Sequence, residues 1–354
     1  MSQKILILGA GKIGRAIVQN LRRDFKITVG DTSWAALESI PDYDIQKGLI
    51  NPNGSDTWDE IIGDNDIVIS ALYCTNNLEI ARACLRQDAS YFDLSEDVET
   101  AESIADIVRK AKPEALFVPQ CGLAPGFVSI AASNLIAQFD SVDNVEIRVG
   151  ALPQNPKNAL KYSLTWSTDG LINEYCNEGQ AIKNGKQIRT LPLGELEELY
   201  ALEQLYEAFN TSGGLGSLWA MDLKGARNVN YKTLRYPGHC EKMRFLLVDC
   251  DFQNHRPELK ALLEATIPYN GQDKVVIHIT VDGQINNRYV SRDYVREIVS
   301  FNDMTAIQLT TANAVCAVVT MYVAGLIGRK GGLLYHHDIP MHTFIQNGFG
   351  NVYA

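Results

Sequence analysis

The sequence is short of positive charge and of paired cysteines. It carries 32 Lys and Arg against 42 Asp and Glu, which gives a formal net charge of −10. Nucleic acids and anionic membranes are bound by broad cationic surfaces, so general binding to either is not expected. The seven cysteines form no Cys-x-x-Cys pair. In a chain of 354 residues, this pattern favours reduced, mostly buried thiols in the cytoplasm over a disulfide framework.

The chain also lacks a recognisable secretion signal, internal repeats and low-complexity linkers. Its first residues, "MSQKILILGAG", have neither the apolar length nor the small-residue cleavage site of a signal peptide. One stretch, 305–328, is long and apolar enough to imitate a membrane span. It contains Gln308, Asn313 and several threonines, and the sequence offers no second span. We therefore interpret it as a buried helix of a protein without a membrane partner.

Strands and helices alternate in the first third of the chain. Short apolar runs there predict buried strands, and apolar residues recur at helical spacing between them. This alternation predicts an N-terminal Rossmann domain, in which a doubly wound parallel sheet has helices on both faces. The expected strands are "KILIL", "KITVG", "DIVISALY", "SYFDLS" and "EALFVPQ", and the expected helices are "GKIGRAIVQNLRR", 77–87 and 97–111.

The rhythm changes after about residue 140, where longer strands predict a second α/β domain on a mixed sheet. We place the first domain at 1–122 and the second at 123–304. The segment 193–214 has good helix formers at helical spacing, which predicts a helix, although it ends in a Thr-Ser-Gly-Gly turn. The strands expected in the second domain are "NVEIRVGAL", "KYSLTWS", "NVNYKTLRY", "DKVVIHITVDG" and "YVREIVSF".

A glycine-rich turn separates the first strand from the first helix. In the pattern Gly9-x-Gly11-x-x-Gly14, the first glycine permits a tight turn, the second admits a pyrophosphate and the third allows close packing. Asp31 ends the second strand, where a carboxylate accepts hydrogen bonds from a ribose and repels a 2′-phosphate. We therefore expect NAD as cofactor in preference to NADP. The expected cofactor contacts are Gly9, Gly11, Lys12, Ile13, Gly14, Asp31, Ser70, Ala71 and Leu72.

Two more features lie where predicted strands end. Asp93 closes the strand in "FDLS", at the sheet edge where doubly wound folds bind ligands. After the next strand, Pro125 leads into a helix whose first backbone N–H groups, at 126–128, suit a carboxylate. No metal site is expected, because the histidines near Asp338 match no strict ligand pattern; they are His336, His337 and His342.

Basic residues gather in "NYKTLRYPGHCEKMRF", residues 230–245, of this acidic chain. Lys232 and Arg235 stand three residues apart on a predicted strand and therefore face opposite sides. Arg235 and His239 flank a Pro-Gly turn and form the better pair: the guanidinium offers a fork for a carboxylate, and the imidazole exchanges protons near neutral pH. Lys242 and Arg244 belong to the following helix and are expected to be solvated or to face a dimer partner.

Six motifs spread over nearly the whole chain recur together in one family. They are "GAGKIG", "FDLS", "GLAPGF", "EYCNEG" after "YSLTWSTDGL", "EAFNTSGG" and "YKTLRYPGHCEKM". With them the chain resembles the saccharopine dehydrogenase superfamily, and within it most closely the lysine 6-dehydrogenases. Two features depart from that subgroup: Gln120 stands where an acid is expected, and Trp166-Ser167 is similar to saccharopine reductases.

The resemblance implies a homodimer in which the second domain carries dimer contacts and much of the substrate pocket. It also implies an extended conformation at 193–214 and an apolar helix at about 305–330 that returns to pack on the first domain. The implied enzyme is an NAD(P)-dependent oxidoreductase acting on CH–NH or CH–NH2 groups, here one that oxidises the ε-carbon of L-lysine with NAD. Its semialdehyde product can cyclise to piperideine-6-carboxylate. His239 and Asp93 are the candidate proton acceptors, and the expected substrate contacts are Arg235, Lys232, Gly126, Phe127, Thr211 and Ser212.

Other activities use similar features. A saccharopine dehydrogenase that releases glutamate performs the same chemistry on a tricarboxylate, and a carboxynorspermidine-type reductase is a third enzyme. A nucleotide-sensing binding protein without turnover is the non-enzymatic alternative. Lysine requires one cation and an apolar slot, for which Tyr162 or Trp166 is a candidate wall. Saccharopine requires several cations, for which the candidates are Arg235, Lys232, Arg148 and Lys161.

Overall fold

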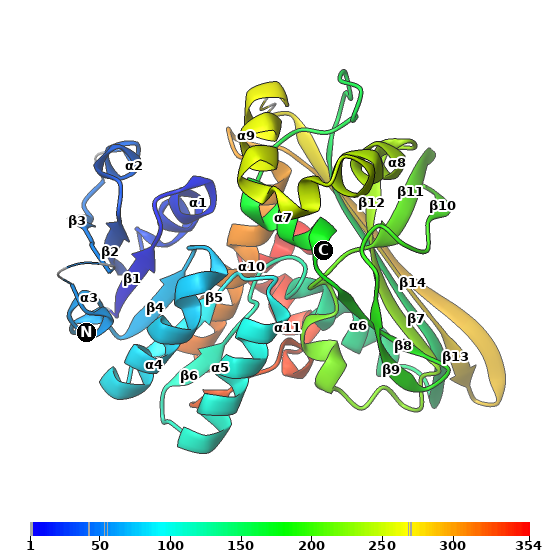
Figure 1. Ribbon diagram of the computed structural model, residues 1–354. Helices are drawn as coiled ribbons and strands as arrows, with labels where there is room; N and C mark the ends of the chain where they lie inside the picture. The colour runs from blue at the N-terminus through cyan, green and yellow to red at the C-terminus, as the bar shows by residue number, and fades with distance from the viewer. Residues whose placement is uncertain (1–2, 42, 53, 55, 268, 270) are drawn as a thin grey trace. The chain divides into compact units, whose positions relative to one another are not determined.

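The chain folds into two compact units (Figure 1). A computed structural model describes residues 3–41, 43–52, 54, 56–267, 269 and 271–354. Unit 1 comprises Met1–Gly126, Thr311–Val352 and Ala354. Unit 2 comprises Phe127–Thr310 and Tyr353.

Unit 1 is built on a parallel sheet of seven strands in the order β15-β6-β5-β4-β1-β2-β3. The chain winds outward from β1 in both directions, which is the order of a Rossmann domain. This confirms the predicted doubly wound sheet. The strands are β1 (Lys4–Leu8), β2 (Lys26–Asp31), β3 (Gln46–Leu49), β4 (Ile67–Ser70), β5 (Ser90–Asp93), β6 (Leu116–Val118) and β15 (Gly332–Leu333).

Helices cover both faces of this sheet. On one face, α1 contacts α10 through a hydrogen bond from Asn20 to Asn313, and Tyr322 of α10 packs against Phe92 of β5. Tyr91, the neighbour of Phe92, belongs to the core on the other face. The helices are α1 (Lys12–Leu21), α2 (Trp34–Glu38), α3 (Trp58–Ile62), α4 (Asn77–Gln87), α5 (Val98–Ala111), α11 (Met341–Gln346) and α10 (Ala306–Val323), whose first residues belong to unit 2.

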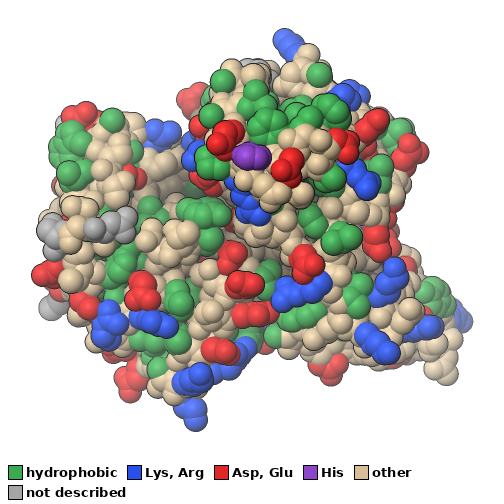
Figure 2. Space-filling model, viewed as in Figure 1, with side chains coloured by type: hydrophobic (Ala, Val, Ile, Leu, Met, Phe, Trp, Pro, Cys, Tyr) green, Lys and Arg blue, Asp and Glu red, His purple; other side chains and the backbone are tan. Residues whose placement is uncertain are grey.

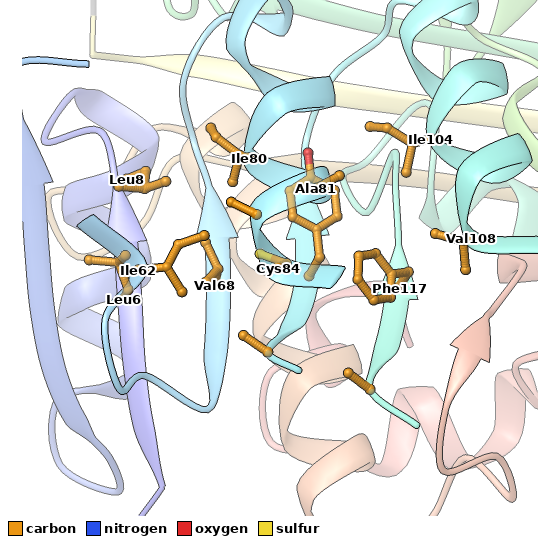
Figure 3. Close-up of a cluster of buried hydrophobic side chains, with 14 of the residues drawn as sticks. Leu6, Leu8, Ile62, Val68, Ile80, Ala81, Cys84, Ile104, Val108 and Phe117 are labelled. Carbon is orange, nitrogen blue, oxygen red and sulfur yellow. The ribbon is translucent and has the colours of Figure 1, made fainter. Parts of the chain in front are cut away.

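The core on the second face joins the sheet to α3, α4 and α5 (Figure 3). Leu6, Val68 and Phe117 come from the strands, and Ile80 and Ile104 come from the helices. Each is at most 1% exposed, and each large apolar side chain buried in this way contributes roughly 1.5–3 kcal/mol. This packing fixes the strand ends from which the loops of unit 1 leave.

Unit 2 contains a mixed sheet in the order β10-β11-β12-β7-β13-β14, with β8 beside β12 and β9 beside β8. Strand β12 runs parallel to β7, and the other pairs found among the described residues are antiparallel. This confirms the predicted mixed sheet. The strands are β7 (Ser141–Pro153), β8 (Gly179–Lys183), β9 (Lys186–Thr190), β10 (Glu197–Ala201), β11 (Gln204–Asn210), β12 (Asn228–Arg235), β13 (Asp273–Ile285) and β14 (Arg288–Val299).

Four helices belong wholly to unit 2. Helix α6 packs against β7, β13 and β14, while α7, α8 and α9 share one apolar core with residues of β11. The helices are α6 (Phe127–Ile136), α7 (Thr168–Cys176), α8 (His239–Arg244) and α9 (Arg256–Thr266). Short helical turns of the two units are η1 (Cys74–Asn76), η2 (Gly216–Ala220), η3 (Phe245–Asp249), η4 (Phe252–Asn254), η5 (His336–Asp338) and η6 (Gly350–Tyr353).

The helix predicted at 193–214 from apolar spacing is wrong, and the extended conformation implied by the resemblance is confirmed. Strands β10 and β11 form an antiparallel hairpin there. Leu202 and Glu203 make its turn with φ of 51° and 61°, and β11 continues the sheet beside β12. Pairing with an existing strand satisfies the backbone of this segment, and that outweighs its intrinsic preference for a helix.

The strand predicted at "KYSLTWS" is also wrong, since residues 161–167 form an irregular segment. The Asn158 side chain bonds both the backbone N–H and the carbonyl of Tyr162, at 3.1 and 2.6 Å, and so takes the place of a neighbouring strand. Tyr162 and Leu164 nevertheless enter the core of unit 2.

Within the part of the chain that the structure describes, one helix, α10, is long and apolar enough to cross a membrane by length and composition. Of that stretch, 56% is buried inside the protein, as expected of a core helix.

Candidate functional site

The glycine-rich edge of unit 1, which we define as Gly9, Gly11 and Gly14, is shaped by backbone contacts. Gly9 has a φ of +102°, a conformation that side chains disfavour. A Cβ on Gly14 would lie 1.8 Å from the Gly9 carbonyl oxygen, so this position has no room for one. A Cβ on Gly11 would meet nothing within 4 Å. The turn is therefore closely packed at Gly9 and Gly14, and it is open at Gly11, where a phosphate would approach.

Asp31 lies against this edge. Its Oδ2 accepts the backbone N–H of Ala10 at 2.7 Å, and its Oδ1 accepts that of Ser33 at 2.8 Å. The carboxylate therefore ties the end of β2 to the glycine turn. This placement is the one that the ribose of a bound dinucleotide requires.

The residues after β4 meet the same turn. A Cβ on Gly9 would lie 3.0 Å from the Ala71 carbonyl oxygen and 3.3 Å from the Leu72 side chain. The Ser70 hydroxyl is fully buried and donates to Asn77 at 2.7 Å, so it holds the loop in place. Lys12 and Ile13 open α1 directly after the turn and are half-buried.

A dinucleotide fits these residues. Gly9 stands where the fold requires a tight turn, and Gly11 stands where it admits a pyrophosphate. The Asp31 carboxylate stands where the fold binds a ribose. The first backbone N–H groups of α1 add a favourable end for the phosphates. The structure thus brings Gly9, Asp31, Ala71 and Leu72 together as the sequence predicted.

Asp93 holds two loops at the same edge of the sheet. Its carboxylate accepts hydrogen bonds from the Tyr91 hydroxyl and from the backbone N–H groups of Ser95 and Gln120, at 2.9, 2.9 and 3.0 Å. Burial raises the pKa of Asp93, and these three donors oppose the rise. Gln120 has a φ of 63° and is pinned by this bond. Asp93 therefore acts on the loops after β5 and β6.

Gly126 ends unit 1 with a φ of +131° and lies against the Gly122 backbone. Phe127 follows at the start of α6, but its side chain is fully buried. Its ring stacks on Tyr353 at 3.7 Å between centroids and packs against Tyr294. The Phe127 side chain is therefore a core residue, and a substrate contact at this position is restricted to the backbone.

Arg235, at the end of β12, is the centre of a buried polar group. Its Nε donates to the Tyr175 hydroxyl and its Nη1 to the Leu234 carbonyl, both at 2.8 Å. The Tyr162 ring lies 5.0 Å from the guanidinium carbon, within range of a cation–π interaction. We call Tyr162, Tyr175, Arg235 and His239 the Arg235 cluster. Arg235 is 2% exposed and forms no ion pair with a described residue, although the buried Glu174 carboxylate acts on it electrostatically.

His239 orients this cluster through a directed chain of hydrogen bonds. Its Nδ1 lies 2.7 Å from the Leu160 carbonyl, which only accepts, so Nδ1 carries the proton. Nε2 then accepts from the Tyr175 hydroxyl at 3.0 Å, and the same hydroxyl oxygen receives Nε–H of Arg235. Each group thus fixes the direction of the next.

The surroundings of His239 argue against the predicted exchange of protons near neutral pH. Burial, with Arg235 nearby, lowers the pKa of His239 to about 3. Both ring nitrogens are already engaged. The imidazole therefore stays neutral and serves to position Tyr175 and Arg235.

Lys232 belongs to a different group from Arg235, as strand alternation predicts. Its Nζ lies 2.6 Å from Glu197 Oε2, and Arg148 Nε contacts Oε1 of the same carboxylate. Burial alone would raise the pKa of Glu197, but Arg148 and Lys232 outweigh it and hold that pKa below its usual value. Lys232 is 6% exposed and neutralised, which argues against the predicted substrate contact.

The end of β11 supplies a polar group that the fold leaves unsatisfied. Thr211 is 3% exposed, and its hydroxyl has no hydrogen-bond partner among the described residues. Ser212 is engaged, since its backbone N–H donates to the Glu174 carbonyl at 3.1 Å. Of the predicted substrate contacts Thr211 and Ser212, Thr211 therefore has a buried hydroxyl that could form a hydrogen bond with a ligand.

Sequence reasoning missed two members of this region. Tyr175 lies in the quoted motif "EYCNEG" but was assigned no role. Glu207 is 5% exposed and accepts the backbone N–H groups of Gly238 and Cys240 at 2.8 and 2.5 Å, so it caps α8 and fixes the turn before His239. The β11–β12 register that places Glu207 opposite Arg235 is a tertiary feature, so no local sequence pattern indicated this role.

The histidines near Asp338 do not converge. His336 is buried, and its Nε2 has no partner within the part of the chain that the structure describes. His337 stacks on Tyr335 at 5.1 Å between centroids. Across the described ranges, no group of three or more His, Cys, Asp or Glu side chains is placed to hold a metal ion.

Known sequences and structures resemble this chain throughout. The saccharopine dehydrogenase NADP binding domain matches residues 5–116, and the saccharopine dehydrogenase C-terminal domain matches residues 122–343. Saccharopine dehydrogenase (NADP(+), L-glutamate-forming) of Saccharomyces cerevisiae is 24% identical over 70% of this chain and 58% of its own length. Alpha-aminoadipic semialdehyde synthase of Bos taurus is 24% identical over 53% of this chain and 21% of its own. The matched region thus spans less than two thirds of each relative.

Solved structures share the fold. Apo saccharopine dehydrogenase (L-Glu forming) from Saccharomyces cerevisiae superposes with a TM-score of 0.79 at 16% identity, covering 97% of this chain and 96% of that one. Homospermidine synthase from Legionella pneumophila, in complex with NAD, has a TM-score of 0.73 at 13% identity, covering 100% and 90%. At these identities the likeness establishes architecture alone. The two family matches, which together cover both units, decide the assignment: the chain belongs to the saccharopine dehydrogenase family.

Proposed function

We propose that the protein is an NAD-dependent amine dehydrogenase that oxidises the ε-carbon of L-lysine. The observation that carries this proposal is the state of the cations in unit 2. Four were candidates for binding a substrate with several carboxylates. Lys232 and Arg148 share Glu197, and Lys161 donates to the Pro237 carbonyl at 3.0 Å. Arg235 forms no ion pair with a described residue, although the Glu174 carboxylate acts on it electrostatically, so its guanidinium can still pair with one substrate carboxylate.

The surroundings of Arg235 support a slender substrate. Tyr162 is 1% exposed and accepts the Trp166 indole N–H at 2.9 Å, so two aromatic side chains are joined beside the guanidinium. Buried apolar residues such as Leu164 and Phe209 belong to the same core. A fixed cation with an aromatic wall matches a carboxylate that is followed by a methylene stem.

NAD is the proposed cofactor because Asp31 places a carboxylate beside the glycine turn, where it would repel a 2′-phosphate. The matched family domain is named for NADP, and the yeast relative uses NADP(+) by its name. The homospermidine synthase structure contains NAD. The proposal therefore rests on Asp31 and not on the relatives.

The reaction balances as an oxidation followed by hydrolysis. A hydride leaves the ε-carbon while the nitrogen lone pair forms a C=N bond, and a bound NAD supplies the acceptor for that hydride. Water then adds to the iminium carbon, ammonia leaves, and the semialdehyde can cyclise by attack of the α-amine. Arg235 holds the α-carboxylate, and Tyr175 and His239 keep the guanidinium in one orientation.

The ε-amine must be neutral when the hydride leaves. His239 is a poor acceptor for its proton because its pKa is about 3 and its nitrogens are occupied. Asp93 remains the candidate acceptor of the two, although three hydrogen bonds already reach its carboxylate. Activity should therefore rise from pH 7 toward 10, following the lysine amine, whose reference pKa is about 10.4.

Steady-state rates on lysine and on saccharopine, with NAD and with NADP, test this proposal. A higher kcat/KM for lysine and release of ammonia support it. A higher kcat/KM for saccharopine, with glutamate as stoichiometric product, replaces it with the second candidate. That candidate is favoured by the yeast relative, which is L-glutamate-forming by its name. If the protein binds the nucleotide but turns over neither compound nor a polyamine-type substrate, the result would favour a nucleotide-sensing binding protein.

A further inference from the structure

A basic cavity that is open to solvent lies in unit 1, at the end of the sheet opposite the glycine-rich edge. Its volume is about 350 Å³. Helix α5 ends there, and strands β6 and β15 begin there, since Lys112 and Pro113 precede β6 and Gly331 precedes β15. Ligands of doubly wound folds gather at the carboxyl ends of the strands, so this cavity has no part in the proposed reaction.

The cavity carries positive charge although the whole chain is acidic. Its charged lining residues are Arg109, Lys112 and Arg329, and no acid lines it among the described residues. Lys and Arg side chains gather over the lower end of α5 in Figure 2. The acids closest in sequence are Asp106, which pairs with Arg109 at 2.7 Å, and Glu114. Among the described residues, only Arg109 of these three cations forms an ion pair.

The rest of the lining is apolar and firmly held. Val108 is 1% exposed and belongs to the core shown in Figure 3, and Leu333 of β15 is 7% exposed. Tyr335 adds an aromatic ring, and its hydroxyl accepts a hydrogen bond from Arg109. A packed floor under a cationic rim distinguishes this feature from charges scattered on a surface.

The loop 325–332 is built to present Arg329 at this rim. Gly325, Gly328 and Gly332 have φ of 70°, 72° and 79°, which places three left-handed turns in eight residues. The Lys330 carbonyl accepts the Tyr322 hydroxyl at 3.3 Å, and the Arg329 guanidinium donates to the Leu333 carbonyl. This hydrogen bond uses one N–H group of Arg329 and holds the guanidinium in place at the cavity.

We propose that this cavity binds a small dianion, either a phosphoryl group or a dicarboxylate, at a site distinct from the cofactor and substrate sites. The Lys112 ammonium group and the remaining N–H groups of Arg329 are donors that such anions require, whereas the Arg109 guanidinium is already bonded to Asp106 and Tyr335 and adds positive charge nearby. The simpler explanation is that Arg109 and Lys112 only offset the negative end of the α5 dipole. That explanation does not account for Arg329, which comes from another segment and faces the same cavity.

Calorimetric titration of the full chain with inorganic phosphate, and separately with succinate, tests the proposal at constant ionic strength. We expect saturable binding of one of the two probes, and which one distinguishes a phosphoryl site from a dicarboxylate site. The double variant Lys112→Gln/Arg329→Gln should weaken that binding by about tenfold or more, because two charge-assisted contacts are lost. Lys186→Gln/Arg189→Gln removes the same charge from exposed positions of β9 and should bind like the wild type.

A labelling experiment keeps the proposal testable if the double variant folds poorly. Acetylation of wild-type lysines, followed by mass spectrometry, should show the bound probe protecting Lys112 and not Lys186. Equal protection of both lysines, weakening by the control variant, or the absence of saturable binding of either probe would refute the site. Neither measurement involves turnover, so failure of the proposed lysine oxidation would leave this result standing.

Discussion

The glycine-rich edge of unit 1 and the Arg235 cluster of unit 2 are built by different means. At the edge, backbone atoms form the site. A Cβ would clash at Gly14 but would meet no atom at Gly11, three residues earlier. In the cluster, buried side chains make it, and they come from α7, β12 and α8 and from the irregular segment before α7. One site is local in sequence and the other is not.

This difference determines what each site can reveal in advance. A backbone site has a fixed spacing because its parts are consecutive residues, so a short pattern identifies it. A side-chain site depends on which strands pair and which helix packs beside them. The predictions below separate the two kinds of site, beginning with the largest expected effect.

Gly14→Ala should abolish cofactor binding and destabilise the protein by about 1–3 kcal/mol, because its Cβ would lie 1.8 Å from the Gly9 oxygen. Gly11→Ala should cost less than about 1 kcal/mol in stability, since space is open there, yet weaken NAD clearly. Urea unfolding and NAD titration measure both effects. Equal behaviour of the two variants would contradict the distinction between a packed and an open glycine.

Arg235→Lys keeps the charge and removes the fork, so the KM for lysine should rise by about 10–100-fold while NAD affinity is unchanged. Lys232→Gln is the matched change three residues away. It leaves Glu197 with Arg148 alone and should lower stability by about 1–2 kcal/mol without changing KM. If KM rises in Lys232→Gln and not in Arg235→Lys, Lys232 and not Arg235 binds the substrate carboxylate.

Acid should destabilise the protein through His239 and His336, one in each unit. Burial lowers the pKa of each to about 3, while the unfolded chain binds a proton at each near pH 6.5. The unfolded state thus binds more protons below pH 6.5, and stability falls by about 2 kcal/mol per histidine between pH 6.5 and 5.

Asp273 opposes this trend. Burial raises its pKa to about 6, so its protonation in the folded state stabilises the protein as the pH falls below that value. Urea unfolding between pH 7 and 5 should still show a net loss. His336→Met should remove the contribution of one histidine from the dependence of the unfolding free energy on pH. An unchanged dependence in that variant would contradict the conclusion that His336 is buried in its neutral form.

Asp31→Asn should reduce the preference for NAD over NADP by about tenfold, the scale of one charged hydrogen bond. The amide still offers an acceptor to Ala10 or Ser33, so the fold should persist. Dissociation constants for both cofactors measure the change. A wild type that already prefers NADP would show that Asp31 does not exclude the phosphate.

Tyr162→Phe is expected to have the smallest effect. The ring over Arg235 is kept, and the hydrogen bond from Trp166 is lost. We expect stability to fall by about 1 kcal/mol and KM to change by about threefold or less. A KM change as large as that of Arg235→Lys would place the Tyr162 hydroxyl in direct contact with the substrate.

Much of unit 1 was predictable because its signals are local. Apolar runs gave the strands, glycine spacing gave the turn, and Asp31 followed from the end of β2. Unit 2 was less predictable at two segments. The helix expected at 193–214 became a hairpin because β12 offered it an edge, and "KYSLTWS" lost its strand because Asn158 took over the backbone bonds of Tyr162.

The sequence by itself determined the Rossmann architecture, the mixed second sheet and the position of the glycine-rich edge, since periodicity and spacing specify these without distant contacts. Only the tertiary structure decided the state of the charged and titratable side chains. Lys232 and Arg235 are equally basic in the sequence, but Glu197 neutralises the first and Tyr175 orients the second. His239 loses its expected titration because burial and Arg235 disfavour its charged form. Charge states depend on the groups that folding brings within a few ångströms, and no local pattern encodes those distances.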